Sequence, residues 1–83
     1  MQIAVCDDER EIREMFAEKI GKLYPKADLS LYRSGEELLS SAKEPDIVLL
    51  DIQMPGRNGM ETAKELRRTN KKVIIIFVTA LDD

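Results

Sequence analysis

The sequence predicts an α/β fold, a doubly wound parallel sheet with helices on both faces and the strand order 2-1-3-4. The first observation behind this prediction is that short apolar runs alternate with segments of helical periodicity, in the order β-α-β-α-β-α-β. The second is that polar residues directly follow three of the apolar runs, at Asp7-Asp8, Asp51 and Thr79. Ligands of doubly wound sheets bind beyond the carboxyl ends of neighbouring strands, so these polar residues mark a candidate functional site.

The first predicted strand and helix lie at the N-terminal end of the sequence. Residues 3–6, IAVC, form a short apolar run that we expect to be a buried strand. Over residues 9–23, apolar side chains recur three or four positions apart, which is typical of one face of a helix. We expect Asp7 or Asp8 to cap this helix and Pro25 to end it. The apolar face consists of Ile12, Met15, Phe16, Ile20 and Leu23.

The middle of the sequence predicts a second strand, a short helix and a third strand. Residues 27–32, ADLSLY, alternate apolar and polar side chains, which predicts a half-exposed edge strand. Ser34 precedes Glu37 by three positions, the spacing of a capping box that opens a helix. After the interruption at Pro45, residues 46–51, DIVLLD, predict a strand that is apolar on both faces.

A third helix and a fourth strand complete the predicted pattern. After the loop QMPGRNG, Met60, Ala63 and Leu66 give the apolar face of an amphipathic helix. Residues 67–72, RRTNKK, are expected to be a solvated helix end whose cations complement the helix dipole. Residues 72–80, KVIIIFVTA, form a β-branched run that predicts a strand apolar on both sides.

Composition restricts the classes of function. With 83 residues and a net charge of -3, the sequence predicts one small domain without a general attraction to nucleic acid or anionic membranes. The single cysteine, Cys6, and the lack of histidine exclude an internal disulfide, Cys/His zinc sites and Ser-His or Cys-His catalysis within these residues. Because no signal peptide and no apolar run of roughly 18 residues is visible, we expect a cytoplasmic protein that contacts no membrane.

The acids at the predicted strand ends indicate a magnesium site and a phosphoryl acceptor. Asp7, Asp8 and Asp51 would repel one another in one crevice, which raises at least one pKa unless a cation compensates. Mg²⁺ typically uses one or two protein carboxylates plus phosphate oxygens, so the site suits Mg²⁺ and a phosphoryl group. Asp51 is the expected nucleophile, since aspartate can form an acyl phosphate. Thr79 offers a hydroxyl donor to the phosphoryl group, and a backbone carbonyl near Gln53 can face the metal.

Each of these residues also has an ordinary structural explanation. Asp7 and Asp8 could begin a helix, Asp51 could accept hydrogen bonds from loop amides, and Thr79 is a common type of strand residue. Cys6, next to the acids, is expected to be a core residue with a raised thiol pKa. Only the joint placement of the polar residues at one edge of the sheet favours the functional interpretation.

Along its whole length the sequence resembles the receiver domain of two-component response regulators, which has the flavodoxin-like fold. The motifs are VCDDE at the first strand end, SGEELL at the second helix, DIVLLDIQMPGRNGMETAKELR around Asp51, and IIFVTA in the fourth strand. The segment around Asp51, with Met54-Pro55 and Gly59, is the most specific of them. IAVCDDE and FVTALDD are similar to receivers that precede LytTR-type DNA-binding domains, so an output domain of this type would follow in the full protein.

This resemblance implies a role for each residue of the site. Asp51 would be the phosphoacceptor, which receives its phosphoryl group from a separate sensor histidine kinase. Asp7, Asp8, Asp51 and the backbone carbonyl of Gln53 would bind Mg²⁺, and Thr79 would be the switch hydroxyl that moves toward the phosphoryl group. The domain would act as a signalling switch rather than as a metabolic enzyme, and this segment itself would contact no nucleic acid.

The sequence departs from the family pattern at its C-terminal end. Family members continue with a fourth helix, a fifth strand and a fifth helix, and a lysine at the end of the fifth strand pairs with the phosphoryl group. Lys71 and Lys72 cannot replace that lysine, because they lie at the opposite end of the fourth strand. Residues 1–83 are therefore expected to be an incomplete receiver domain, which associates as a homodimer or larger assembly through its exposed fourth strand.

Three alternative functions use the same residues differently. The missing lysine favours a receiver-like fragment that binds a metal or a partner without being phosphorylated. A phosphatase of the haloacid dehalogenase type would carry a second aspartate two positions after Asp51, where this sequence has Gln53. A flavodoxin would need a phosphate loop rich in Ser and Thr after the first strand, where this sequence has acids.

Overall fold

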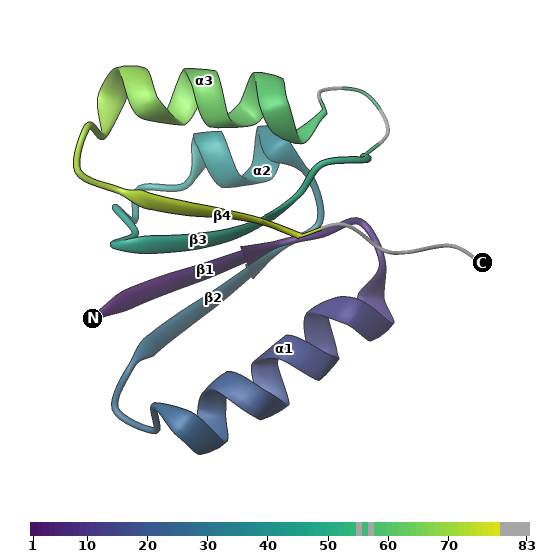
Figure 1. Ribbon diagram of the computed structural model, residues 1–83, viewed down its shortest axis with the longest axis vertical. Coiled ribbons are helices and arrows are strands. Elements are labelled where there is room, and N and C mark those ends of the chain that lie inside the picture. Colours follow the sequence, from purple (N-terminus) through teal and green to yellow (C-terminus); the bar gives the residue numbers. More distant parts are fainter. Residues whose placement is uncertain (55, 57, 79–83) are drawn as a thin grey trace.

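The structure, a computed structural model, describes residues 1–54, 56 and 58–78. Parallel strands form one sheet in the order β2-β1-β3-β4, which confirms the predicted topology (Figure 1). Helices lie on both faces of the sheet, as the predicted doubly wound class requires (Figure 1). The elements, in chain order, are β1 (Gln2–Cys6), α1 (Arg10–Leu23), β2 (Asp28–Tyr32), α2 (Gly35–Ser40), β3 (Ile47–Asp51), α3 (Gly59–Thr69) and β4 (Ile74–Val78).

The register of the two central strands brings their carboxyl ends to the same level. β1 lies between β2 and β3, and its last residue, Cys6, is paired with Leu50 of β3. The next residue along each strand, Asp7 and Asp51, therefore lies at the same edge of the sheet. On the other side of β3, Asp51 is paired with Val78 of β4.

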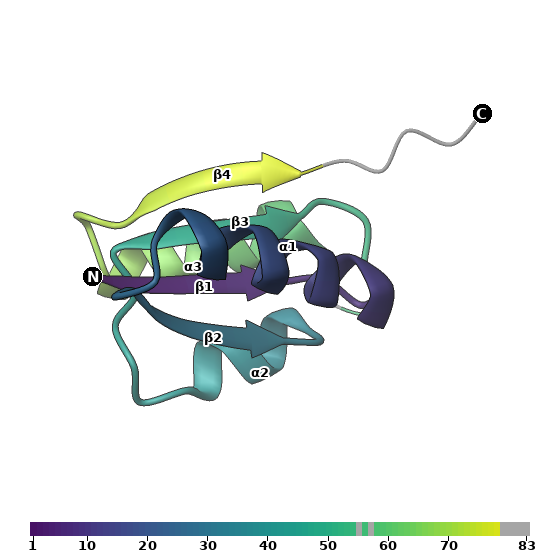
Figure 2. The ribbon, with the colours of Figure 1, turned by 90° about the horizontal axis from the view of Figure 1, so that it is seen from below.

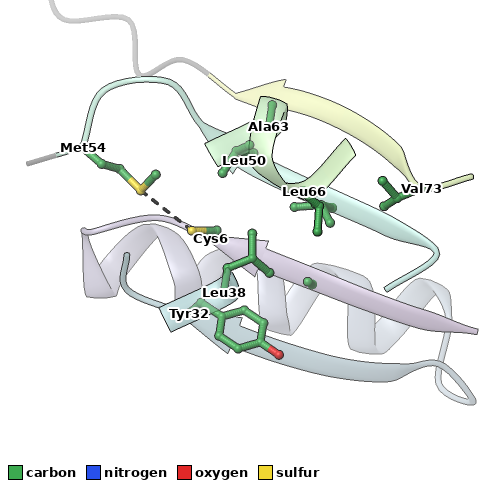
Figure 3. Close-up of a cluster of buried hydrophobic side chains, with 10 residues drawn as sticks. Cys6, Tyr32, Leu38, Leu50, Met54, Ala63, Leu66 and Val73 are labelled. Atoms are coloured by element: carbon green, nitrogen blue, oxygen red, sulfur yellow. Dashed lines mark hydrogen bonds between the residues drawn. The ribbon is translucent and has the colours of Figure 1, made fainter. Parts of the chain in front are cut away.

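The buried core lies between the sheet and the helices α2 and α3 (Figure 1), and Figure 3 shows its side chains. Because strand side chains alternate between the two faces, Ala4 and Cys6 of β1 and Leu50 of β3 point to the same side. Met54, in the loop after β3, also belongs to this core, and its sulfur lies 3.8 Å from Cys6 Sγ (Figure 3). This contact fixes the start of the loop beneath the sheet edge. The core cluster is Ala4, Cys6, Tyr32, Leu38, Val48, Leu50, Met54, Ala63, Leu66 and Val73.

The face of the sheet beneath α1 is covered less completely. α1 lies over this face (Figure 2), but it contributes no fully buried side chain. Two residues of its predicted apolar stripe, Met15 and Leu23, are 40% and 71% exposed, and a third, Ile20, lines an apolar groove. The groove has a volume of about 250 Å³. Its lining consists of Met1, Ile3, Ile20, Tyr24, Ile47, Leu49 and Ile76.

The helix starts correct one prediction and confirm another. The N-cap residue of α1 is Glu9, which makes no side-chain capping bond, so the predicted cap by Asp7 or Asp8 is wrong. These two acids still belong to the turn that leaves the sheet edge, and Asp7 Oδ1 accepts a hydrogen bond from the Glu9 N–H at 2.8 Å. Ser34 caps α2 as predicted, because its hydroxyl accepts from the Glu37 N–H at 3.1 Å.

A few side chains differ in burial from what their pattern predicts. Met60 is exposed, whereas Ala63 and Leu66 of the same predicted face are buried. Tyr32 is buried at the end of the strand that was expected to be half-exposed, and its hydroxyl donates to Ser41 Oγ at 2.8 Å. None of the helices in the described part of the chain has the length and apolar character of a membrane span.

Candidate functional site

Three carboxylates gather at the carboxyl ends of β1 and β3. Asp7, Asp8 and Asp51 each place an oxygen within 4.8 Å of one another. Asp7 and Asp51 are buried, with 6% and 8% of their surface exposed, whereas Asp8 is exposed at the mouth of the cluster. The strand ends thus bring together the three acids that the sequence predicts, two of them fixed in the sheet edge and one facing solvent.

Asp7 is held by hydrogen bonds on three sides. Its backbone N–H donates to the Tyr32 carbonyl of β2 at 3.0 Å, which continues the ladder between β1 and β2. Its carboxylate accepts from the Glu9 N–H at 2.8 Å, and its carbonyl accepts from Arg13 Nη1 of α1 at 2.8 Å. The backbone and side chain of this acid are therefore fixed by the neighbouring strand, the turn and the helix together.

The loop after Asp51 turns back sharply around that residue. The Gln53 N–H donates to Asp51 Oδ1 at 3.1 Å, and the Gly59 N–H at the start of α3 donates to the Ile52 carbonyl at 2.9 Å. A side chain at position 59 would overlap the Asp51 carbonyl oxygen and the Ile52 Cα, so the close approach requires glycine. Asn58 then caps α3, because its side-chain oxygen accepts from the Glu61 N–H at 2.9 Å.

The pKa of Asp51 and the pKa of Asp7 are both raised. For Asp51, burial is the main cause; the Gln53 N–H opposes the shift, and the charges of Asp7 and Asp8 add to it. For Asp7, burial again raises the pKa most, the Glu9 N–H lowers it, Asp8 raises it and Arg13 lowers it. The predicted mutual repulsion is therefore present, although loss of contact with water is the larger effect.

The donor set of this cluster suits a hard divalent cation. All three side chains offer carboxylate oxygens, and the salt bridges between described residues involve none of the three. Mg²⁺ typically takes one or two protein carboxylates and completes its octahedron with water or phosphate oxygens. The cluster therefore fits Mg²⁺ in the nature of its ligands, and a bound cation would compensate the buried charge.

The residues that the sequence predicts for the site are only partly placed by the structure. Gln53 lies beside Asp51, and the proposed role of its carbonyl stays a prediction. Thr79, the predicted switch hydroxyl, lies outside the described residues, as does Pro55 of the loop. Sequence reasoning missed Arg13, because a basic residue near the start of a helix is normally a surface residue and only the fold shows its contact.

Cys6 lies directly before the acids and belongs to the core, as predicted. Its side chain is fully buried. Burial, together with the nearby charges of Asp7 and Asp51, raises the pKa of the Cys6 thiol to about 12. The thiol is therefore protonated at neutral pH, whereas nucleophilic chemistry would need the thiolate.

Comparison with known proteins gives one consistent result. The family model described as response regulator receiver domain matches residues 3–83. The positive alginate biosynthesis regulatory protein of Pseudomonas aeruginosa is 40% identical over 86 residues, which cover 100% of this chain and 35% of that protein. The sensory transduction protein LytT of Oceanobacillus iheyensis is 39% identical over 89 residues, which cover 99% of this chain and 35% of that protein. The chain thus spans about a third of the length of these curated relatives.

Among solved structures, the chain is similar to the response regulator protein TrrA from Thermotoga maritima, in complex with Mg(2+)-BeF. The sequences are 37% identical and the TM-score is 0.87, with 98% of this chain and 70% of that chain covered.

Proposed function

Because the chain belongs to the response regulator receiver domain family, we propose that Asp51 is the phosphoacceptor of a two-component signalling switch. The observation that carries this proposal is the cluster of Asp7, Asp8 and Asp51 at the adjacent ends of β1 and β3. Asp51 is rigidly placed, because its backbone is paired in β3 and its carboxylate accepts from the Gln53 N–H at 3.1 Å. One carboxylate oxygen would attack while the other keeps this hydrogen bond.

The proposed reaction transfers a phosphoryl group from a phosphohistidine of a sensor kinase. An Asp51 oxygen forms a bond to phosphorus while the phosphorus–nitrogen bond of the phosphohistidine breaks, and the leaving imidazole takes up a proton. Asp7, Asp8, Asp51 and the Gln53 carbonyl would hold Mg²⁺, which neutralises charge on the phosphoryl oxygens when bound. The Thr79 hydroxyl would donate to one of those oxygens and report the modified state.

The donor of the phosphoryl group and the output of the signal would lie outside these residues. The 83 residues contain no histidine, so the proposed donor is a histidine of a separate sensor kinase in the cytoplasm. The sequence relatives are named as regulatory and sensory transduction proteins, and they extend well beyond the matched segment. A DNA-binding output domain, of the LytTR type, would provide the response in a full-length protein.

Incubation with Mg²⁺ and acetyl phosphate, followed by intact mass measurement, tests the acceptor assignment. We expect one added phosphoryl group on the chain and none on Asp51→Asn. Asp46→Asn is the matched control, because it removes the same charge from the residue just before β3. It should be phosphorylated like the unmodified chain.

Two results would contradict the proposal. Phosphorylation of Asp51→Asn would place the acceptor elsewhere. No phosphorylation of the chain, despite measurable Mg²⁺ binding, would favour the alternative of a domain that binds metal or a partner without accepting phosphate.

We also propose that two copies of this chain associate through β4. β4 lies at the edge of the sheet, so the backbone groups on its outer side have no strand partner among the described residues. Ile74, Ile76 and Phe77 are 58%, 47% and 40% exposed, which leaves apolar surface on both faces of this edge. An antiparallel pairing centred on Ile76 would place Ile75 opposite Phe77 of the second copy, so that apolar side chains meet on each face.

A further inference from the structure

We propose that Arg13 is a positioning residue, which holds Asp7 in the geometry that binds the cation. This inference rests on the proposed function, because it takes the acid cluster to be a Mg²⁺ site. Arg13 is the fourth residue of α1, and its Nη1 donates to the Asp7 carbonyl at 2.8 Å. The side chain thus reaches back across the turn and binds the main chain of a residue whose carboxylate faces the cluster.

The Arg13 contact closes the short connection between β1 and α1. Residues 7–9 link the strand to the helix, and within this link the Asp7 carboxylate accepts from the Glu9 N–H. The Arg13 backbone N–H donates to the Glu9 carbonyl at 3.1 Å, which makes the first turn of α1. Arg13 therefore binds both ends of the connection, one through its backbone and the other through its side chain.

α1 packs against the sheet only through partly buried side chains. No side chain of α1 is fully buried, and an apolar groove separates part of the helix from the sheet. Leu66 of α3 is buried in the core, whereas every apolar side chain of α1 is at least partly exposed. The hydrogen bond from Arg13 is thus a specific link between the position of α1 and the position of Asp7.

The positive charge of Arg13 and its hydrogen bond to Asp7 have opposite effects on cation binding, so an experiment can distinguish them. A guanidinium near the acids repels Mg²⁺, so its removal would tighten Mg²⁺ binding at neutral pH if charge alone mattered. If Arg13 positions Asp7, its removal weakens Mg²⁺ binding despite the lost repulsion. The sign of the change in affinity therefore distinguishes positioning from electrostatics.

The test compares Arg13→Ala with Arg10→Ala by titration with Mg²⁺ alone, using calorimetry. Arg10 lies in the same helix and is paired only with Glu14 on the surface among the described residues, so it controls for the loss of one positive charge. We expect Arg13→Ala to bind Mg²⁺ roughly threefold to tenfold more weakly, the range that one hydrogen bond provides. Arg10→Ala should bind with equal or slightly higher affinity, and Arg13→Lys should recover most of the loss.

A second readout follows Asp7 without any metal. The NMR signal of the Glu9 amide reports the hydrogen bond to the Asp7 carboxylate, and we expect it to shift or broaden in Arg13→Ala but not in Arg10→Ala. Arg13→Gln, which keeps the aliphatic stem, takes the place of Arg13→Ala if the latter does not fold. Unchanged or tighter Mg²⁺ binding by Arg13→Ala, or an unchanged Glu9 signal, would overturn the proposal.

Failure of the proposed function would look different. An unmodified chain that binds no Mg²⁺ would contradict the metal site itself, and the Glu9 signal would still decide whether Arg13 positions Asp7.

Discussion

At the scale of single residues, the acid cluster combines opposing effects on the same carboxylates. Burial and neighbouring acids raise the pKa values of Asp7 and Asp51, while backbone N–H groups of Glu9 and Gln53 stabilise the charged forms. The hydrogen bonds offset only part of the cost, because both pKa values remain above the ordinary value. The two acids are thus held in place by the backbone but still lack a full countercharge, which a cation would provide.

The raised pKa values predict how Mg²⁺ affinity depends on pH. As the pH falls through the raised pKa values, protons compete with Mg²⁺ for Asp7 and Asp51, and affinity decreases by about tenfold per pH unit for each proton displaced. The decrease should begin at a higher pH than for ordinary aspartates. Mg²⁺ titrations over a pH series at constant ionic strength measure this effect, and an affinity that stays constant down to the ordinary aspartate range would contradict it.

The same shifts fix the sign of the effect of pH on stability without metal. A carboxyl with a raised pKa binds its proton more tightly in the folded state than in the unfolded state. Its stabilising contribution is therefore present at low pH and is lost as the pH rises through the folded pKa. In the absence of Mg²⁺, ionisation of Asp7 and Asp51 costs stability at neutral pH.

The sequence predicted the acids of the site better than the groups that hold them. Asp7, Asp8 and Asp51 were found because residues that follow parallel strands meet at one edge of the sheet. The prediction that Asp7 or Asp8 caps α1 was wrong, because the Asp7 carboxylate instead accepts the Glu9 N–H within the turn before the helix. The local sequence pattern does not distinguish these two uses of the acid. Arg13 was missed because its contact depends on where α1 lies against the strand end.

At the scale of elements, α2 and α3 pack closely through one glycine and one threonine. Gly35 begins α2 and is buried, and Thr62 of α3 is fully buried with its hydroxyl donating to the Asn58 carbonyl at 2.9 Å. A side chain at position 35 would overlap Thr62 Oγ1. The Ser34 cap and the Asn58 cap therefore lead into helices that meet at their first turns.

This packing predicts non-additive effects on stability. Gly35→Ala should lower the free energy of unfolding by about 1–3 kcal/mol, because the core there has no room for a methyl group. Thr62→Ala removes the overlapping oxygen and leaves the Cβ of residue 62 at 3.2 Å from the methyl group added at position 35. The free energy of unfolding of the double variant should therefore fall by about 1 kcal/mol less than the sum of the two single losses. Urea denaturation of all four proteins measures the coupling.

A second helical glycine, Gly21, has open surroundings and provides the control for Gly35→Ala. Gly21 lies in α1, and apart from adjacent residues and the helix backbone, no group lies within 4 Å of the position that an alanine methyl would occupy there. Gly21→Ala should therefore raise the free energy of unfolding by about 0.5–1 kcal/mol, since alanine favours the helix without meeting a neighbour. Additive losses for Gly35→Ala and Thr62→Ala would contradict close packing of α2 against α3.

The sequence predicted where the helices and strands lie, but it did not predict which of their faces are buried. Apolar periods predicted α1, α3 and the strands of the described part of the chain, and the capping box predicted α2, which Ser34 caps as expected. Met15 and Leu23 were expected to be on a buried face but are exposed. A periodic pattern shows which side of a helix is apolar, but what covers that side depends on the rest of the fold.

At the scale of the whole molecule, the sheet is protected unequally at its two edges. Both β2 and β4 are edge strands, and each has an exposed apolar side chain. On β2 it is Leu31, near the end of the strand, and on β4 it is Ile76, at the centre. β4 differs because apolar side chains are exposed on both of its faces, with Ile74 and Phe77 beside Ile76. The apolar pattern and the exposure of this strand were both predicted from the sequence, and the structure shows which of its side chains are exposed.

The proposed association through β4 predicts a concentration-dependent dimer. Sedimentation velocity should show a mass that increases with concentration for the unmodified chain. Ile76→Lys should weaken association by at least about tenfold, because an unpaired charge in the interface costs more than ~1.4 kcal/mol. Leu31→Lys, the same change on the opposite edge strand, should associate like the unmodified chain. A monomer at all concentrations, or equal weakening by both changes, would contradict a dimer through β4.

The order of the strands has a consequence for local unfolding. Asp7 and Asp51 follow from β1 and β3, the two strands that have a neighbour on each side, whereas the exposed apolar surface lies on β4 and α1. Local openings begin where few buried contacts hold an element, and segments with the most neighbours open last. Fraying of the outer strand β4 would therefore leave Asp7 and Asp51 on their central strands, whereas opening of α1 would release the Arg13 hydrogen bond that holds Asp7.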